Sequence, residues 1–398
     1  MLLAALALLA LNLRAPLTSV APLLKPLRDD LGLSDTAVGV LTSLPVLCLG
    51  LFAFVAPRLD RRYSGRMLLT VALLVLSVGG LVRTGASPAA LFAGTVLVAA
   101  PIGIANVLIP GLIKRQFAQS VPRVSAFYSG ALTFGAAGGP ALAVPLAEAT
   151  GSSWRVPLLL LVVPVALATV VVILIALDRQ PSGGATASAP GPGGRPPLPW
   201  RSRLAWQVTV FFGAQALLSY TVFGWLPTIW QDRGLSAASA GFALSLCNAV
   251  GVIGAWLLAA SGRSLADQRA AGVTVACLTA SGLAGAVAGP RGLAWPSTAV
   301  LGLGLGAGFA LALSLFALRS PDAPTTAALS AMGQGIGYLI GVLGPLGAGA
   351  LHDMTGTWVW PLAVLLTICA VQAMVGLTVG KARMVTVTPP RRPRRASP

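Results

Sequence analysis

The stretch DLGLSDTAVG at residues 30–39 returns in the second half of the chain as DRGLSAASAG at residues 232–241. The two copies are offset by 202 residues, and the ordered matches continue beyond them. At an offset of 205 residues, Gly139-Pro140 pairs with Gly344-Pro345. Matches that keep their order at a nearly constant offset indicate a duplicated unit.

Long apolar runs fill both copies. The chain is 56% hydrophobic and 9% charged, whereas soluble domains carry about 25% charged residues. We predict an all-α membrane protein, because many runs approach or exceed the roughly 20 apolar residues that a bilayer requires. Twelve transmembrane helices are expected, at residues 2–27, 35–57, 67–86, 89–112, 124–148, 154–177, 204–229, 236–260, 271–288, 295–318, 324–350 and 358–380.

This division predicts two pseudo-symmetric six-helix bundles, at residues 1–177 and 204–381. The segment 178–203 between them is rich in Pro, Gly and Ser, which is typical of a flexible linker. Residues 382–398 form a basic tail, which we expect to be disordered.

The basic residues predict the orientation. Twenty of the 27 Lys and Arg residues fall in the tail or in loops on one side, six fall on the other side, and Arg14 lies within a span. By the positive-inside rule, the linker and both termini are cytoplasmic, and the protein is a multi-pass protein of the inner (plasma) membrane. Because the basic residues lie in short loops around apolar runs, we expect the lipid bilayer and no nucleic acid as partner.

Two parallel six-helix halves joined by a cytoplasmic loop resemble the major facilitator superfamily. The loop APRLDRRYSGRM at residues 56–67 is similar to the signature between the second and third helices of that superfamily. The resemblance implies a substrate site between the halves, opened alternately to each side. It also implies a conformational latch made by Asp60, Arg61 and, in the second copy, Arg263. A generic positively charged loop is the alternative for each latch residue.

Arg14 lies about halfway along the first predicted helix. An unpaired Arg at the bilayer centre costs at least about 2.5–3.5 kcal/mol, so it must face the bundle interior or a watery cavity. No acidic residue is expected at mid-depth, and at an offset of 202 residues Arg14 corresponds to Ala216. We infer an electropositive cavity whose ligand is an anion or carries an electron-rich group. The alternative is that Arg14 binds backbone carbonyls freed by Pro16.

Three stretches resemble the cyanate and 2-nitroimidazole transporter family: residues 11–24 (LNLRAPLTSVAPLL), 32–59 and 68–83. The resemblance implies a secondary active or facilitated transporter of a small anion or small polar solute. An exporter of drugs or nitroaromatic compounds with the same fold is the alternative. We see no nucleophile–base constellation, metal cluster or Walker motif, so we expect no enzyme, cofactor or metal site. Protons are a possible coupling partner, and we expect a monomer.

Polar residues at mid-depth are candidates for the substrate site, because each could donate a hydrogen bond to a bound anion. Each could instead join two helices. The expected site comprises Asn12, Arg14, Asn106, Tyr128, Gln215, Asn248, Gln334 and Tyr338, with Thr133 and Tyr220 as further candidates.

Overall fold

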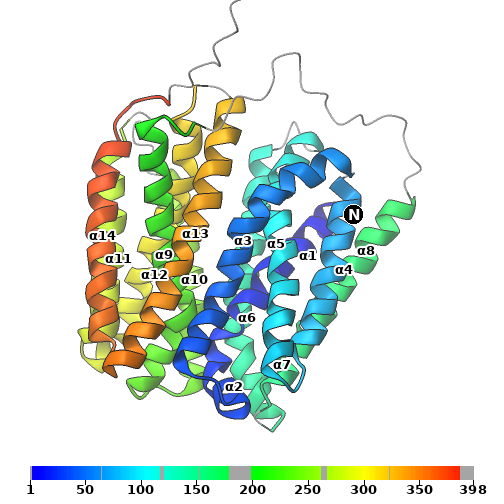
Figure 1. Ribbon diagram of the computed structural model, residues 1–398, viewed down its shortest axis with the longest axis vertical. Helices are drawn as coiled ribbons and strands as arrows, with labels where there is room; N and C mark the ends of the chain where they lie inside the picture. Colours follow the sequence, from blue (N-terminus) through cyan, green and yellow to red (C-terminus); the bar gives the residue numbers. More distant parts are fainter. Residues whose placement is uncertain are drawn as a thin grey trace, which may run out of the picture.

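The computed structural model describes residues 2–63, 65–116, 121–151, 153–178, 199–260, 267–321 and 323–385. In these ranges the regular structure is helical, without a strand (Figure 1). The α-helices are α1 (Leu2–Thr18), α2 (Leu24–Leu31), α3 (Asp35–Arg62), α4 (Gly65–Arg83), α5 (Pro88–Gln116), α6 (Val121–Ala149), α7 (Arg155–Leu160), α8 (Val162–Asp178), α9 (Arg203–Asp232), α10 (Ala237–Ala260), α11 (Arg269–Ala288), α12 (Ala294–Leu318), α13 (Ala323–Thr355) and α14 (Val359–Val379). Two 3-10 turns accompany them, η1 (Ala21–Leu23) and η2 (Arg291–Leu293).

Each of the twelve predicted spans coincides with a helix or a broken helix. The first span breaks into α1, η1 and α2. The Ser19 hydroxyl donates to the Ala15 carbonyl over 2.6 Å, and Pro22 follows within η1. Side-chain bonds of this kind compete with the helical ladder, and proline cannot donate to it. The sixth span breaks between α7 and α8, where Pro164 cannot donate to the carbonyl one turn earlier.

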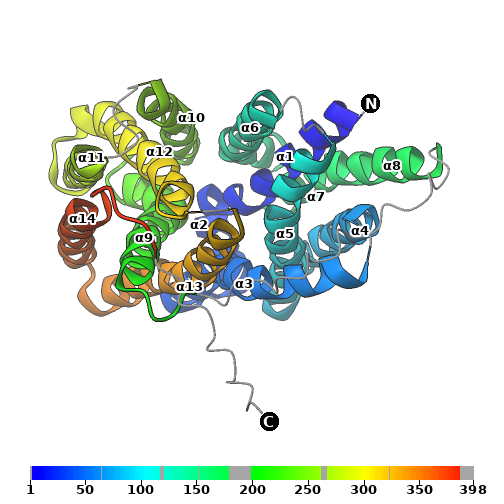
Figure 2. The ribbon, with the colours of Figure 1, turned by 90° about the horizontal axis from the view of Figure 1, so that it is seen from above.

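Figures 1 and 2 show two groups of helices side by side, α1 to α8 and α9 to α14. They meet along two seams, where α3 packs on α13 and α6 packs on α10. The predicted linker lies almost entirely outside the described residues, as does most of the predicted tail.

The two seams repeat one contact. A Cβ added to Gly39 in α3 would lie 3.5 Å from the Pro345 carbonyl oxygen of α13. A Cβ added to Gly241 in α10 would lie 2.9 Å from the Pro140 carbonyl oxygen of α6. These are the glycine and proline positions that the sequence repeat pairs. The interface between the halves therefore keeps the symmetry of the duplication.

We call the end of the molecule that holds α2 and the start of α10 the outer end, following the predicted orientation. Gly32 and Gly234 end the helices there with φ of 63° and 93°, a left-handed conformation that favours glycine. An apolar cluster at this end draws on both halves, for example Leu27 and Trp154 of the first and Trp225 of the second. The outer ends of the two halves are therefore packed against each other.

Each half also carries what we call an outer clasp, a tryptophan that donates to an aspartate. Trp154 Nε1 donates to Asp30 Oδ2 over 3.0 Å, and Trp358 Nε1 donates to Asp232 Oδ2 over 3.0 Å. The aspartates are counterparts at an offset of 202 residues, and the tryptophans belong to the matched WRVPL and WVWPL stretches. The two halves therefore share this side-chain contact as well as the glycine that ends the helix beside it.

Many large apolar side chains point outward. Phe134, Trp256 and Leu343 are 74%, 70% and 63% exposed. Eight helices in the described ranges are long and apolar enough to cross a membrane, and shorter apolar helices accompany them. Such a surface is unsuited to water and suited to lipid, so the fold is that of a multi-pass membrane protein.

Candidate functional site

Arg14 projects from α1 toward the second half of the molecule. Its Nη1 donates to the Tyr220 hydroxyl of α9 over 3.4 Å. The two residues line a cavity of about 40 Å³ between the halves, together with residues of α3 such as Thr42 and residues of α9 such as Phe223. This volume exceeds the roughly 10–15 Å³ that one water molecule needs on the same measure. The cavity can therefore hold a small solute or a few water molecules.

No carboxylate pairs with Arg14 among the described residues. The ion pairs there join Lys25 to Asp232, Arg155 to Asp30 and Arg269 to Asp267. The acidic side chains that the structure describes are all exposed and lie at helix ends or in loops; they are Asp29, Asp30, Glu148, Asp232, Asp267 and Asp353. A cation without a protein counter-ion leaves the cavity electropositive.

Three of the four tyrosines of the chain surround Arg14. Besides Tyr220, the phenols of Tyr128 in α6 and Tyr338 in α13 lie within electrostatic reach of the guanidinium. The rings of Tyr220 and Tyr338 meet edge to face, with centroids 6.0 Å apart, and Phe223 lies against Tyr220 at 5.9 Å. Helices of both halves therefore supply hydroxyl groups and aromatic faces to one place.

Two of the expected site residues form hydrogen bonds between helices instead. Asn12 Nδ2 donates to the Pro164 carbonyl of α8 over 3.1 Å. Gln215 is fully buried; its Nε2 donates to the Leu305 carbonyl of α12 over 3.0 Å, and its Oε1 accepts from Gln372. These bonds lie inside one half or the other, which is the alternative that the sequence left open.

The remaining candidates lie nearer the seams. Asn248 Nδ2 donates to the Ala136 carbonyl of α6 over 3.5 Å and so bridges the halves. Gln334 in α13 donates to the Ser330 hydroxyl over 2.8 Å. Asn106 in α5 is half-buried. Their roles in binding stay predictions.

The predicted latch lies outside what the structure describes. Asp60 and Arg61 fall in the last turn of α3, but their side chains are not described, and neither is Arg263. The latch thus stays a prediction.

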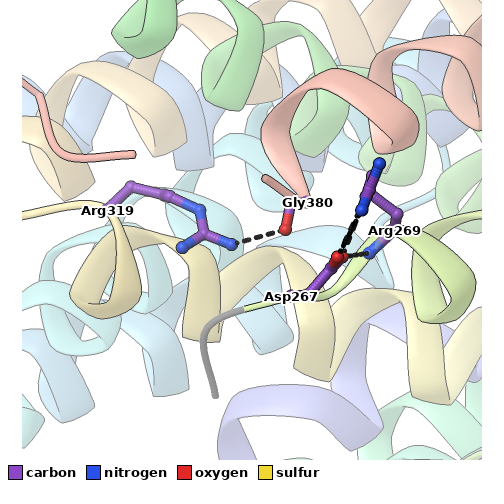
Figure 3. Close-up of polar contacts among 4 residues, drawn as sticks. All are labelled: Asp267, Arg269, Arg319 and Gly380. Carbon is purple, nitrogen blue, oxygen red and sulfur yellow. Dashed lines mark hydrogen bonds and ion pairs between the residues drawn. The ribbon is translucent and has the colours of Figure 1, made fainter. Parts of the chain in front are cut away.

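The loop between α10 and α11 contains Arg263 and is described from residue 267 on. This part holds an ion pair near the predicted cytoplasmic end (Figure 3). Arg269 donates to both carboxylate oxygens of Asp267, with the shortest contact at 2.7 Å, and this lowers the pKa of Asp267 to about 2. Nearby, Arg319 Nε and Nη2 donate to the carbonyls of Val379 and Gly380 over 2.7 and 3.0 Å. A cation at the carboxyl end of α14 is favourable because the last carbonyls lack helical partners.

One residue of the cavity was missed by the sequence reasoning. Arg83 is one of the six basic residues that the sequence pattern places on the outer side, yet it is the last residue of α4 and only 1% exposed. It lines the same cavity as Arg14. A basic residue at the end of an apolar run carries no signal that its side chain turns inward.

Two groups of helices, outward apolar surfaces and a charged cavity between the groups are features of a membrane transporter. The chain belongs to the Major Facilitator Superfamily, whose model matches residues 2–345.

Among individual proteins, the chain is 35% identical to the 2-nitroimidazole transporter of Escherichia coli, over 96% of both chains. It is 32% identical to the cyanate transport protein CynX of Escherichia coli, over 93% of this chain and 94% of that protein. The fold is similar to the crystal structure of a D-xylose–proton symporter, with a TM-score of 0.75 and 13% identity over 96% of this chain and 98% of the symporter. The predicted resemblance to the cyanate and 2-nitroimidazole transporters is confirmed.

Proposed function

We propose that the protein carries a small anion, or a small flat solute with an electron-rich group, across the plasma membrane by alternating access. Arg14 is the electrostatic anchor of the substrate. The observation that carries the proposal is a guanidinium in a cavity between the halves, without a carboxylate partner among the described residues.

A bound anion would compensate the buried charge of Arg14. A buried charge is costly unless it is paired, and among the described residues Arg14 donates one long hydrogen bond, to the Tyr220 hydroxyl. An anion that enters the cavity would supply the missing partner and accept charge-assisted hydrogen bonds. The charge therefore favours an anion over a cation of the same size.

The named relatives support this substrate class. Cyanate is a small anion, and 2-nitroimidazole is a small ring with nitro oxygens that accept hydrogen bonds. The aromatic faces of Tyr220, Phe223 and Tyr338 beside Arg14 suit a flat ligand. The same aromatic faces suit the nitroaromatic substrates of the second candidate, an exporter.

Flux into proteoliposomes tests the proposal. The wild-type protein should take up cyanate, and nitrate and 2-nitroimidazole should compete. Arg14→Gln removes the charge and should reduce uptake at least about 30-fold, because truncating a buried charge contact typically costs about 2–5 kcal/mol. Arg155→Gln removes the ion-pair partner of Asp30 at the outer end and should retain uptake. Full activity of Arg14→Gln would refute the assignment.

Direction needs a separate measurement. Cells that overproduce the protein should become more sensitive to 2-nitroimidazole if it imports the compound and more resistant if it exports it. Equal sensitivity with and without the protein would remove nitroaromatic compounds from the substrate class.

A further inference from the structure

Arg83 occupies an unusual place for a basic residue at a helix end. Its side chain is 1% exposed, although α4 ends at the outer side of the molecule. Gly94 of α5 packs directly on its backbone, since a Cβ at Gly94 would clash with the Arg83 backbone nitrogen. This close approach fixes the end of α4 against α5 and leaves the guanidinium on the inner side.

The guanidinium is incompletely satisfied. Nη1 donates to the Pro16 carbonyl of α1 over 2.8 Å, while the buried Nε has no hydrogen-bond partner among the described residues. Arg83 forms no ion pair with any carboxylate that the structure describes. A buried charge with an orphaned donor is rare in proteins and calls for a ligand or ion.

The other polar groups of the cavity do not meet this need. The hydroxyls of Thr18, Thr42 and Thr95 donate to carbonyls of their own helices, over 3.2, 3.0 and 2.7 Å. None of these hydroxyls accepts a hydrogen bond from Arg83 in the described structure, where Nη1 of Arg83 donates to Pro16. The cavity is therefore lined by two guanidinium groups, and no described carboxylate offsets their mutual repulsion.

We propose that Arg83 is a second substrate-binding residue, which together with Arg14 forms a two-arginine site for a small anion with acceptor atoms at both ends. Cyanate and nitrate have this chemistry. This inference rests on the proposed function and adds a second point of contact on the outer wall of the cavity. A neutral ligand gains less from the second guanidinium, so Arg83 favours anions over neutral solutes of similar size.

The test compares an anionic and a neutral ligand on full-length protein in proteoliposomes. Arg83→Gln keeps a donor for the Pro16 carbonyl but removes the charge. The KM for cyanate should rise at least tenfold, since a hydrogen bond to a charged group is worth about that much or more. The inhibition constant of 2-nitroimidazole should change less than threefold. Arg83→Lys should restore part of the affinity for cyanate, and Arg155→Gln should leave both constants unchanged.

A merely structural Arg83 would alter both ligands equally or neither, and either result would overturn the inference. If Arg83→Gln does not give a monodisperse protein, Arg83→Lys decides alone. Its KM for cyanate should rise at least threefold because a strongly hydrated ammonium lacks the planar donor fork of the guanidinium, and an unchanged KM would overturn the inference. Failure of the proposed function looks different, because the wild-type protein would then show no cyanate uptake, or Arg14→Gln would leave uptake intact.

Discussion

The two halves carry the same outer clasp but use it differently. In the first half, Asp30 pairs with Arg155 of the same half over 2.9 Å. In the second half, Asp232 pairs with Lys25, which comes from the first half, over 2.8 Å. One copy therefore braces its own bundle, and the other ties the two bundles together.

The same contrast holds deeper in the molecule. The seams repeat glycine and proline contacts, whereas Arg14 corresponds to Ala216, a residue that is 1% exposed. α4 ends in Arg83, whereas α11 has no basic residue in its last turn. The duplication preserves the scaffold, whereas the two arginines that we assign to substrate binding belong to the first half.

The largest effect is expected when a positive charge is placed in the second half, at the position that corresponds to Arg14. Ala216→Arg should destabilise the protein by more than about 3 kcal/mol, because a buried charge there has no partner and α13 packs closely on this position. Yield of folded protein and the thermal unfolding temperature in detergent measure this. Ala216→Met, which adds volume without charge, should cost clearly less. If both variants lost the same stability, side-chain packing alone would account for the difference between the halves at this position.

The seams offer a matched pair of smaller changes. Gly241→Ala should be about 1–3 kcal/mol less stable than Gly39→Ala, because its Cβ meets a carbonyl oxygen at 2.9 Å rather than 3.5 Å. The gain in helix propensity from Gly to Ala is the same in both variants and cancels from their difference in stability, since both glycines lie near the start of equivalent helices. The thermal unfolding temperatures of the two variants give the difference, and identical values would contradict the seam geometry.

The ion pairs made by the two clasp aspartates should differ in their effect on conformation. Lys25→Gln should raise the population with separated outer ends by about 1.4- to 5-fold, the range expected for an exposed ion pair of about 0.2–1 kcal/mol. Arg155→Gln should leave this population unchanged. Spin labels at Asp29→Cys and Ser236→Cys, both exposed positions, would report the distance distribution. An equal response to the two changes would mean that neither clasp ties the halves together.

The smallest effect concerns pH and the inner loop. Because Arg269 lowers the pKa of Asp267 to about 2, the ionised carboxylate stabilises the fold above the unfolded-state pKa of about 4. That contribution falls as the pH drops toward about 2. Asp267→Asn should therefore lower the unfolding temperature slightly at pH 7 and not at pH 2. A loss of equal size at both pH values would contradict the ion pair.

The sequence predicted the parts of this fold that depend on pattern. The repeat marked Gly32 with Gly234, and Pro140 with Pro345, and the structure uses these pairs as helix ends and seams. The mid-depth charge of Arg14 was also visible, because apolar runs make any charge within them conspicuous.

Side-chain direction could not be predicted in the same way. Gln215 and Tyr220 lie five residues apart on α9, yet Gln215 faces α12 and α14 while Tyr220 faces Arg14. Arg83 turns inward because Gly94 lets α5 approach it, which is a contact between helices and not a property of either segment alone. The site depends on such three-dimensional contacts, whereas the fold depends on the repeat.

A structure with bound selenocyanate, a heavier analogue of cyanate, tests the central claim most directly. The anomalous signal of selenium should place the anion in the cavity between the halves, within hydrogen-bonding distance of the Arg14 guanidinium. A selenium peak elsewhere, or an Arg14 side chain paired with a carboxylate of the protein, would contradict the account.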